Sequence, residues 1–133
     1  MQTMQQRRAE YALRKIEETV EEAKENKKLI LKEFKSYALG FPAMIRMNGL
    51  GQAAAFYLSK GAGEKGNVAY LSLYTLLSSW MTEAGKPYKN HKNLITGITT
   101  GDMHLYRLAQ AEALLLLDWV KKFAKTYMEE DKK

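Results

Sequence analysis

One apolar segment organises the chain, and it reads Pro42-Ala43-Met44-Ile45-Arg46-Met47-Asn48-Gly49-Leu50-Gly51-Gln52. It predicts a short helix that has Pro42 in its first turn and that Gly49 terminates after Asn48. Asn48 is expected to satisfy the backbone of the turn, and Gly49 and Gly51 to let helices approach closely. Arg46 interrupts the apolar stretch, so it either extends its charged end to solvent or faces a binding partner.

On both sides of this segment apolar residues recur at steps of three and four, the period of an amphipathic helix. The pattern predicts helices over about 3–24, 30–40, 42–48, 50–60 and 67–83, at most two turns within 93–101, and a long helix over 103–127 that Asp102 caps. Asn26 is expected to stop the first helix in a left-handed conformation. The 67–83 helix is apolar on most sides, so it is either deeply buried or faces a partner.

These elements predict an all-α fold, a compact single-domain helical bundle of about five to seven helices. The domain is expected to span residues 1–133, with 128–133 as a frayed tail. There are no cysteines, which excludes disulfides and thiolate metal sites and suits a reducing cytoplasm. The most apolar run, Ala113 to Leu117, is far too short to span a bilayer, so we expect a cytoplasmic protein without a membrane partner.

The net charge of +6 is unevenly distributed along the chain. Residues 29–101 contain eight Lys and Arg against three Asp and Glu, whereas the two ends are nearly balanced. A basic excess in one stretch favours a polyanionic partner such as a nucleic acid. The alternative is a solvated basic surface of the kind common in proteins from hot environments.

The sequence offers no constellation for catalysis, and we expect no catalytic residue, no metal and no cofactor. Residues 61–66 read G-x-G-x-x-G, but helices are predicted on both sides where a dinucleotide fingerprint requires strands. Asn67 and Val68 stand where a Walker A loop requires Lys and Ser or Thr. The histidines, His91 and His104, have no acidic cluster or nucleophile in a matching pattern.

Several local strings together resemble one family, the small all-α subunit of the type III-B (Cmr) CRISPR effector complex. The strings are Arg8-Ala9-x-Tyr11-Ala12, Tyr37-Ala38-Leu39-x-x-Pro42-x-x-Ile45-x-x-Asn48-Gly49-Leu50-Gly51-Gln52, Glu112-Ala113-Leu114 and Leu117-x-Trp119-x-Lys121-Lys122-Phe123-Ala124. The resemblance covers nearly the whole chain. It departs mildly at Lys122, where the family more often has Arg, and in the 61–66 loop, which is variable.

The resemblance implies a non-catalytic subunit in antiviral defence. In this family, copies stack head to tail beside the subunits that hold the guide RNA, and the groove between the two filaments carries the guide–target duplex. The implied partners are therefore the other Cmr subunits, guide RNA, target RNA and further copies of the chain.

Basic residues are the candidates for contacts with the RNA backbone, which would be independent of sequence. The helical candidates are Lys121, Lys122 and Lys125 beside Trp119 and Phe123, then Arg7, Arg8, Arg14 and Lys15, and Arg46. A further group, Lys86, Lys89 and Lys92, lies in the basic loop, which we define as residues 85–92. For each of them the alternative is a solvated lysine or arginine.

Two other functions remain open at this point. A protein-binding adaptor would use the apolar excess of residues 68–81 as its interface and touch no RNA. A free-standing nucleic-acid binder would need strong binding by the isolated chain, against which the mixed charge of both terminal helices argues.

Overall fold

Five helices build the part of the chain that the computed structural model describes, residues 1–128, and no strand occurs within it. They are α1 (Met4–Glu25), α2 (Leu31–Gly61), α3 (Val68–Met81), α4 (Leu94–Thr100) and α5 (Met103–Tyr127). The predicted all-α bundle of five to seven helices is therefore confirmed. The segment predicted as a frayed tail lies outside the described residues except for Met128, which is 3% exposed and belongs to the core.

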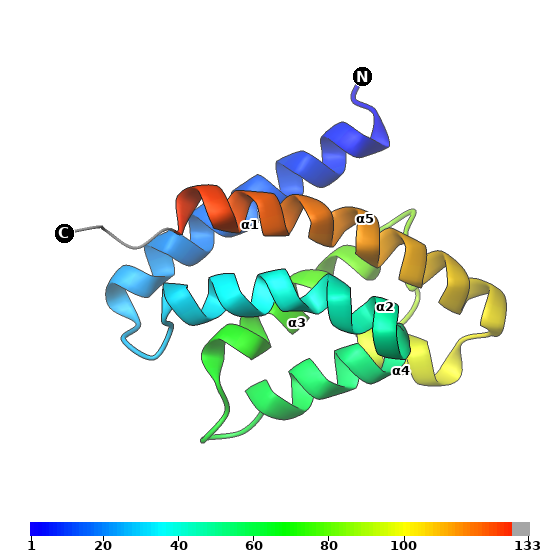
Figure 1. Ribbon diagram of the computed structural model, residues 1–133. Helices are drawn as coiled ribbons and strands as arrows, with labels where there is room; N and C mark the ends of the chain where they lie inside the picture. The colour runs from blue at the N-terminus through cyan, green and yellow to red at the C-terminus, as the bar shows by residue number, and fades with distance from the viewer. Residues whose placement is uncertain (129–133) are drawn as a thin grey trace.

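The helices pack around the bent α2 (Figure 1). Its first half lies along α5, and its second half folds back on the other side of the bend. α3 packs mainly against α2, whereas α1 packs against α5, and the short α4 contacts α2 and α3. Between them lies one apolar core to which every helix contributes.

The first half of α2 contradicts the prediction of a helix end at Gly40 and a new helix start at Pro42. The helix runs without interruption from Leu31 through both residues. Phe34, Ala38, Phe41 and Ile45 all lie in the core, so the buried stripe continues past the proline. Burial of this stripe outweighs the roughly 3 kcal/mol that an internal proline costs a helix.

The predicted break at Gly49 is confirmed, and it divides α2 into two halves. Gly49 has φ 88° and ψ 159°, a region essentially restricted to glycine. Beyond the break, the Leu50 N–H donates to Gln110 Oε1 at 2.9 Å and the Gly51 N–H donates to the Tyr106 hydroxyl at 2.8 Å. The acceptors for this turn thus come from α5 and not from Asn48, which is exposed.

Polar side chains cap most helix starts, as the sequence suggests. Asp102 accepts from the Leu105 N–H at 2.9 Å and begins α5 where predicted. Asn26 does stop α1, but its φ of −101° is extended, which corrects the left-handed conformation predicted for it. Its side chain instead accepts from the Lys28 N–H at 3.0 Å, a local turn that ends the helix without strain.

Two glycines of the 61–66 segment, Gly61 and Gly66, serve close packing, whereas Gly63 has open space around it and a φ of +85°. A Cβ on Gly61 would lie 2.5 Å from the backbone nitrogen of Leu71, and one on Gly66 would overlap the carbonyl of Gly61. The loop therefore needs glycine at both positions, where the end of α2 lies close to the start of α3.

α3 itself is mostly buried, which accounts for its apolar excess. Among the described residues, none of the helices is long and apolar enough to cross a membrane.

Candidate nucleic-acid interface

Basic side chains from two helices meet where α2 lies along α5. Lys122 Nζ is 2.6 Å from Asp118 Oδ2, and Lys121 Nζ is 4.0 Å from Asp118 Oδ1. The hydrogen bond from Lys122 lowers the pKa of Asp118, and the charges of Lys122, Lys121 and Arg46 lower it further. Arg46 belongs to α2, and its charge is near enough to act on this α5 carboxylate.

We call this group the seam cluster, and it comprises Arg46, Lys121, Lys122 and Lys125 around Asp118. Lys125 stands one helical turn beyond Lys121, so both point to the same side of α5. Arg46, Lys122 and Lys125 are exposed. Within residues 1–128, Asp118 is the carboxylate that pairs with Lys121 and Lys122, so the described part of the cluster has a positive excess that a phosphate can use.

Aromatic rings flank the seam cluster on the α1 side of α5. The Trp119 and Phe123 ring centroids are 5.7 Å apart, and Lys122 Nζ is 5.9 Å from the Trp119 centroid. Both rings are partly buried against the core. Their burial fixes this turn of α5, and with it the direction in which Lys122 extends.

Arg8, one of the α1 candidates, is a structural residue. Its Nε and Nη2 donate to Glu112 at 2.7 and 2.8 Å, and the Trp80 indole N–H donates to the same carboxylate at 2.8 Å. Burial disfavours the charged Glu112, but the hydrogen bonds from Arg8 and Trp80 outweigh it, so the pKa of Glu112 is lowered. The side chains of Arg8 and Glu112 are only 13% and 12% exposed. The network ties α1, α3 and α5 together.

The other α1 candidates are on the surface, but most are neutralised locally. Arg14 and Lys15 both pair with Glu18, at 3.8 and 3.4 Å, and both lie near the ring of Tyr11. Arg7 is exposed, and its Nη1 lies 3.9 Å from Met4 Sδ. α1 thus offers less free positive charge than its sequence suggests.

The basic loop is divided by burial. Lys86 is 5% exposed and lies with its Nζ 4.2 Å from the centroid of the Trp80 ring, where its charge also acts on Glu112. It is therefore directed into the core and not toward a ligand at the surface. Lys89 and Lys92 are exposed.

The histidines do not assemble a chemical site with acidic neighbours. His91 lies with its ring against Tyr88 at 5.4 Å, and its Nδ1 is buried without a hydrogen-bond partner in the described part of the chain. His104 is exposed at the start of α5. Within residues 1–128, no group of three or more His, Cys, Asp or Glu side chains is arranged to hold a metal ion.

Sequence reasoning missed two features of this arrangement. It named Arg46 as a candidate but did not group it with Lys121 and Lys122, since nothing in the sequence says that the helix before Gly49 lies along α5. It also missed the Arg8–Glu112–Trp80 network. The one available signal is that Glu112 stands between the apolar positions Ala109 and Leu116, beside the buried stripe of α5.

Comparison with known families adds one finding to this geometry. The model of a family described as CRISPR-associated protein (Cas_Cmr5) matches residues 4–127. The match begins at the first residue of α1 and ends at the last residue of α5.

Proposed function

Because the chain belongs to the Cas_Cmr5 family, whose members are small subunits of the type III-B (Cmr) CRISPR complex, we propose that it contacts the RNA backbone of that complex through the seam cluster. In this role it is a non-catalytic cytoplasmic subunit that supports binding of target RNA. Its partners are the other Cmr subunits, guide and target RNA, and further copies of itself.

The observation that supports RNA contact is the group of Lys121 and Lys122 around Asp118, at 4.0 and 2.6 Å, with exposed Lys125 one turn further along α5. The charge of Arg46, on α2, also acts on Asp118. Cations from two packed helices keep a fixed spacing, so they can meet phosphates without ordering a loop. Such contacts neutralise phosphates and do not read bases, as a complex programmed by different guides requires.

Head-to-tail stacking of copies is the second part of the proposal. Open stacking requires two different surfaces on each copy that complement one another without closing a ring. Stacked copies would add their few phosphate contacts along one RNA, so weak individual binding becomes avid. We therefore expect the isolated chain to bind RNA weakly.

The test compares the assembled complex with a variant in which Lys121, Lys122 and Lys125 are all alanine. We expect weaker retention of target RNA, with the log–log salt slope reduced by about 0.7 for each phosphate that the variant no longer neutralises. Arg14→Ala is the matched control, because Arg14 lies on α1 among glutamates and outside the seam cluster, so its removal should change retention little. Circular dichroism of each variant checks that the helices remain.

The two alternatives predict different results. If retention and salt slope do not change in the triple variant, the seam cluster does not bind RNA, and the chain is a protein-binding adaptor. That adaptor would not use α3, whose apolar residues are buried, but the outer face of α5, where Leu108 and Leu115 are 48% and 47% exposed. Tight RNA binding by the isolated chain would instead indicate a free-standing nucleic-acid binder.

A further inference from the structure

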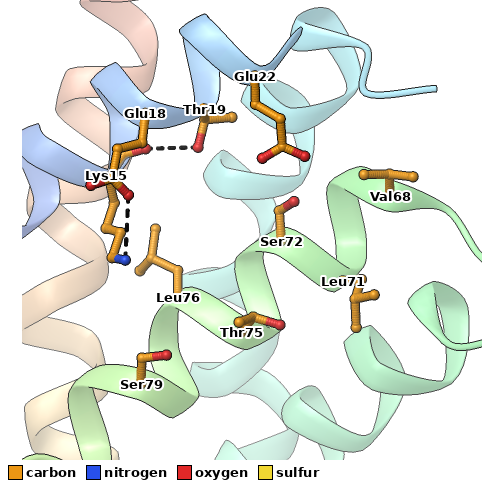
Figure 2. Close-up of a pocket in the computed structure, with 10 residues that line it drawn as sticks. All are labelled: Lys15, Glu18, Thr19, Glu22, Val68, Leu71, Ser72, Thr75, Leu76 and Ser79. Atoms are coloured by element: carbon orange, nitrogen blue, oxygen red, sulfur yellow. Dashed lines mark hydrogen bonds and ion pairs between the residues drawn. The ribbon is translucent and has the colours of Figure 1, made fainter. Parts of the chain in front are cut away.

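A groove lies between α1 and α3, and none of the seam-cluster residues lines it (Figure 2). At one end the helices are held together by Tyr11, whose hydroxyl donates to the Leu76 carbonyl at 2.7 Å and whose ring lies 4.8 Å from that of Trp80. Beyond this contact the helices diverge and leave an open groove of about 280 Å³. No other described segment covers it.

The walls of the groove differ in chemistry. Lys15, Glu18 and Glu22 extend from α1, and Lys15 Nζ lies 3.4 Å from Glu18 Oε1. In Figure 2 the Glu22 carboxylate points across the groove toward Ser72 and has no cation beside it among the residues drawn. The α3 wall presents hydroxyl groups, and Leu71, which is 37% exposed, lies at its outer end. Carboxylates, hydroxyl acceptors and an apolar edge together suit the ammonium head and the aliphatic stem of a lysine side chain.

The charge of α1 argues that the occupant is a protein and not RNA. Five glutamates gather on the half of α1 that forms the groove, and they are Glu17, Glu18, Glu21, Glu22 and Glu25. Lys15, Arg14 and Lys24 offset only part of this charge, since they pair with Glu18 and Glu21. A polyanion is repelled from such a surface, whereas a basic protein segment is attracted to it.

The chain itself presents a basic segment of matching size, the basic loop. Buried Lys86 and Tyr88 anchor it, and the Tyr88 ring lies against Gly97 of α4. Turns fix its backbone, because the Lys89 N–H donates to the Lys86 carbonyl at 3.2 Å and the His91 N–H donates to the Tyr88 carbonyl at 2.9 Å. Lys89 and Lys92 are therefore displayed on a preformed loop that contains no acidic residue, which lowers the entropy cost of docking.

The groove runs along α3 from Val68 to Ser79, so its Ser79 end adjoins the start of the basic loop and its Glu22 end lies toward the α1–α2 connection. In Figure 1 the α1–α2 end lies at the left and the connection between α3 and α4 lies at the right. The Glu22 end of the groove and the α3–α4 connection that contains the basic loop are separate surfaces, so successive copies can engage one another through them in an open series.

We propose that the basic loop of one copy docks in the α1–α3 groove of the next copy, with Lys89 and Lys92 facing Glu18 and Glu22. This assignment rests on the stacking proposed above and identifies the two surfaces that form it. It also gives Lys89 and Lys92 a protein partner and leaves RNA to the seam cluster.

Crosslinking in the assembled complex tests the contact directly, because the chain has no cysteine and any thiol is an introduced one. Glu22→Cys combined with Lys89→Cys should yield a ladder of dimers, trimers and higher species with a short bismaleimide. Each single variant should yield no ladder. Glu10→Cys with Lys89→Cys is the matched control, since Glu10 lies on α1 about two turns before Glu18 and outside the groove.

Native mass spectrometry of the same complexes counts the copies per complex, and so tests the stacking separately from the groove contact. Several copies per complex without a ladder would overturn the groove contact and leave stacking intact. A single copy per complex would overturn the stacking itself and the groove contact with it. A ladder of equal strength from the Glu10 control would overturn the assignment to the groove.

Charge exchange provides an independent readout. Glu18→Lys with Glu22→Lys, or Lys89→Glu with Lys92→Glu, should each weaken association between copies at least about tenfold, because like charges would then face one another. Combining all four substitutions should restore it. If the lysine reversal instead lowers RNA retention and leaves the number of copies unchanged, the loop binds RNA and the proposal is wrong.

Discussion

Gly49 shows how one residue shapes the bundle. Its backbone conformation is one that only glycine adopts readily, and its turn is completed by Tyr106 and Gln110 of α5. Because of the bend, the two halves of α2 run in different directions, and each half packs separately against neighbouring helices. Arg46 precedes the bend by less than one turn, so the same residue also determines which part of α5 lies beside it.

Substitution of Gly49 by Ala should destabilise the protein by about 1–3 kcal/mol, because the required conformation is strained for a residue with a Cβ. The new Cβ would also lie 3.1 Å from the Tyr106 hydroxyl. Gly40→Ala is the matched comparison. Gly40 is helical and a Cβ there meets nothing closer than 3.7 Å, so we expect a gain of about 0.5–1 kcal/mol. Urea unfolding midpoints would measure both, and an equal loss in the two variants would contradict the continuous helix.

Glu112 is the second residue on which the packing depends. Glu112→Gln should lower the free energy of unfolding at neutral pH by about 1.5–3 kcal/mol, because it removes the charge that Arg8 and Trp80 bind. The folded pKa of Glu112 lies below its ordinary value of 4.5, so the unfolded chain binds the proton first as pH falls. Stabilisation by this carboxylate is thus complete well above pH 4.5 and is lost as pH falls from there through the lowered pKa.

Urea unfolding of wild type and Glu112→Gln across this acidic range measures that contribution. The two curves of free energy against pH should converge as the solution becomes more acidic. Parallel curves would show that the ionisation of Glu112 is not linked to folding.

At the scale of elements, α4 and the basic loop form one unit. A Cβ on Gly97 would lie 2.5 Å from Cγ of Tyr88, so α4 can dock only because residue 97 has no side chain. Tyr88 in turn is held by its N–H bond to the Met81 carbonyl at 3.0 Å. The conformation of the loop therefore depends on a helix that follows it in the sequence.

Gly97→Ala should displace Tyr88 and destabilise the protein by about 1–3 kcal/mol, the usual cost of overpacking. Hydrogen exchange at the amides of Tyr88 and His91 should accelerate more than exchange in α1, because the loop loses its support first. Thr99→Ala on the exposed side of α4 is the control and should change stability by no more than about 0.5 kcal/mol. Equal acceleration in both variants would show that α4 does not fix the loop.

At the scale of the whole molecule, charge is sorted between surfaces. The seam cluster is basic, and the groove half of α1 is acidic, although the terminal segments of the sequence look nearly neutral. The net charge of a sequence segment does not show this separation, because positive and negative residues of one helix lie on different surfaces.

Asp118→Asn tests the basic surface in the direction opposite to lysine removal. It removes the carboxylate that pairs with Lys122 and Lys121, and it leaves their positive charges free for phosphate. We expect RNA retention by the assembled complex to strengthen about twofold to fivefold at low salt and the difference to shrink as salt screens it. Weaker retention in this variant would mean that Asp118 itself takes part in binding or that the cluster does not face RNA.

The sequence alone determined the helical class, the start of α5 at Asp102 and the break at Gly49. Those features depend on local physics: periodic burial, a capping carboxylate and a backbone conformation reserved for glycine. Local strings also carried the family resemblance, which the match over residues 4–127 confirms.

Only the tertiary structure established what depends on contacts between distant residues. Burial of Phe41 and Ile45 carries α2 through Gly40 and Pro42, against their local preference to end a helix. From the sequence, Arg8 and Lys86 look like surface charges. In the fold, Arg8 pairs with Glu112 and Lys86 lies over the ring of Trp80, which itself donates to Glu112. Arg46 joined the basic end of α5 in the same way. Such pairings follow from packing free energy summed over the whole core, which no local window of the sequence contains.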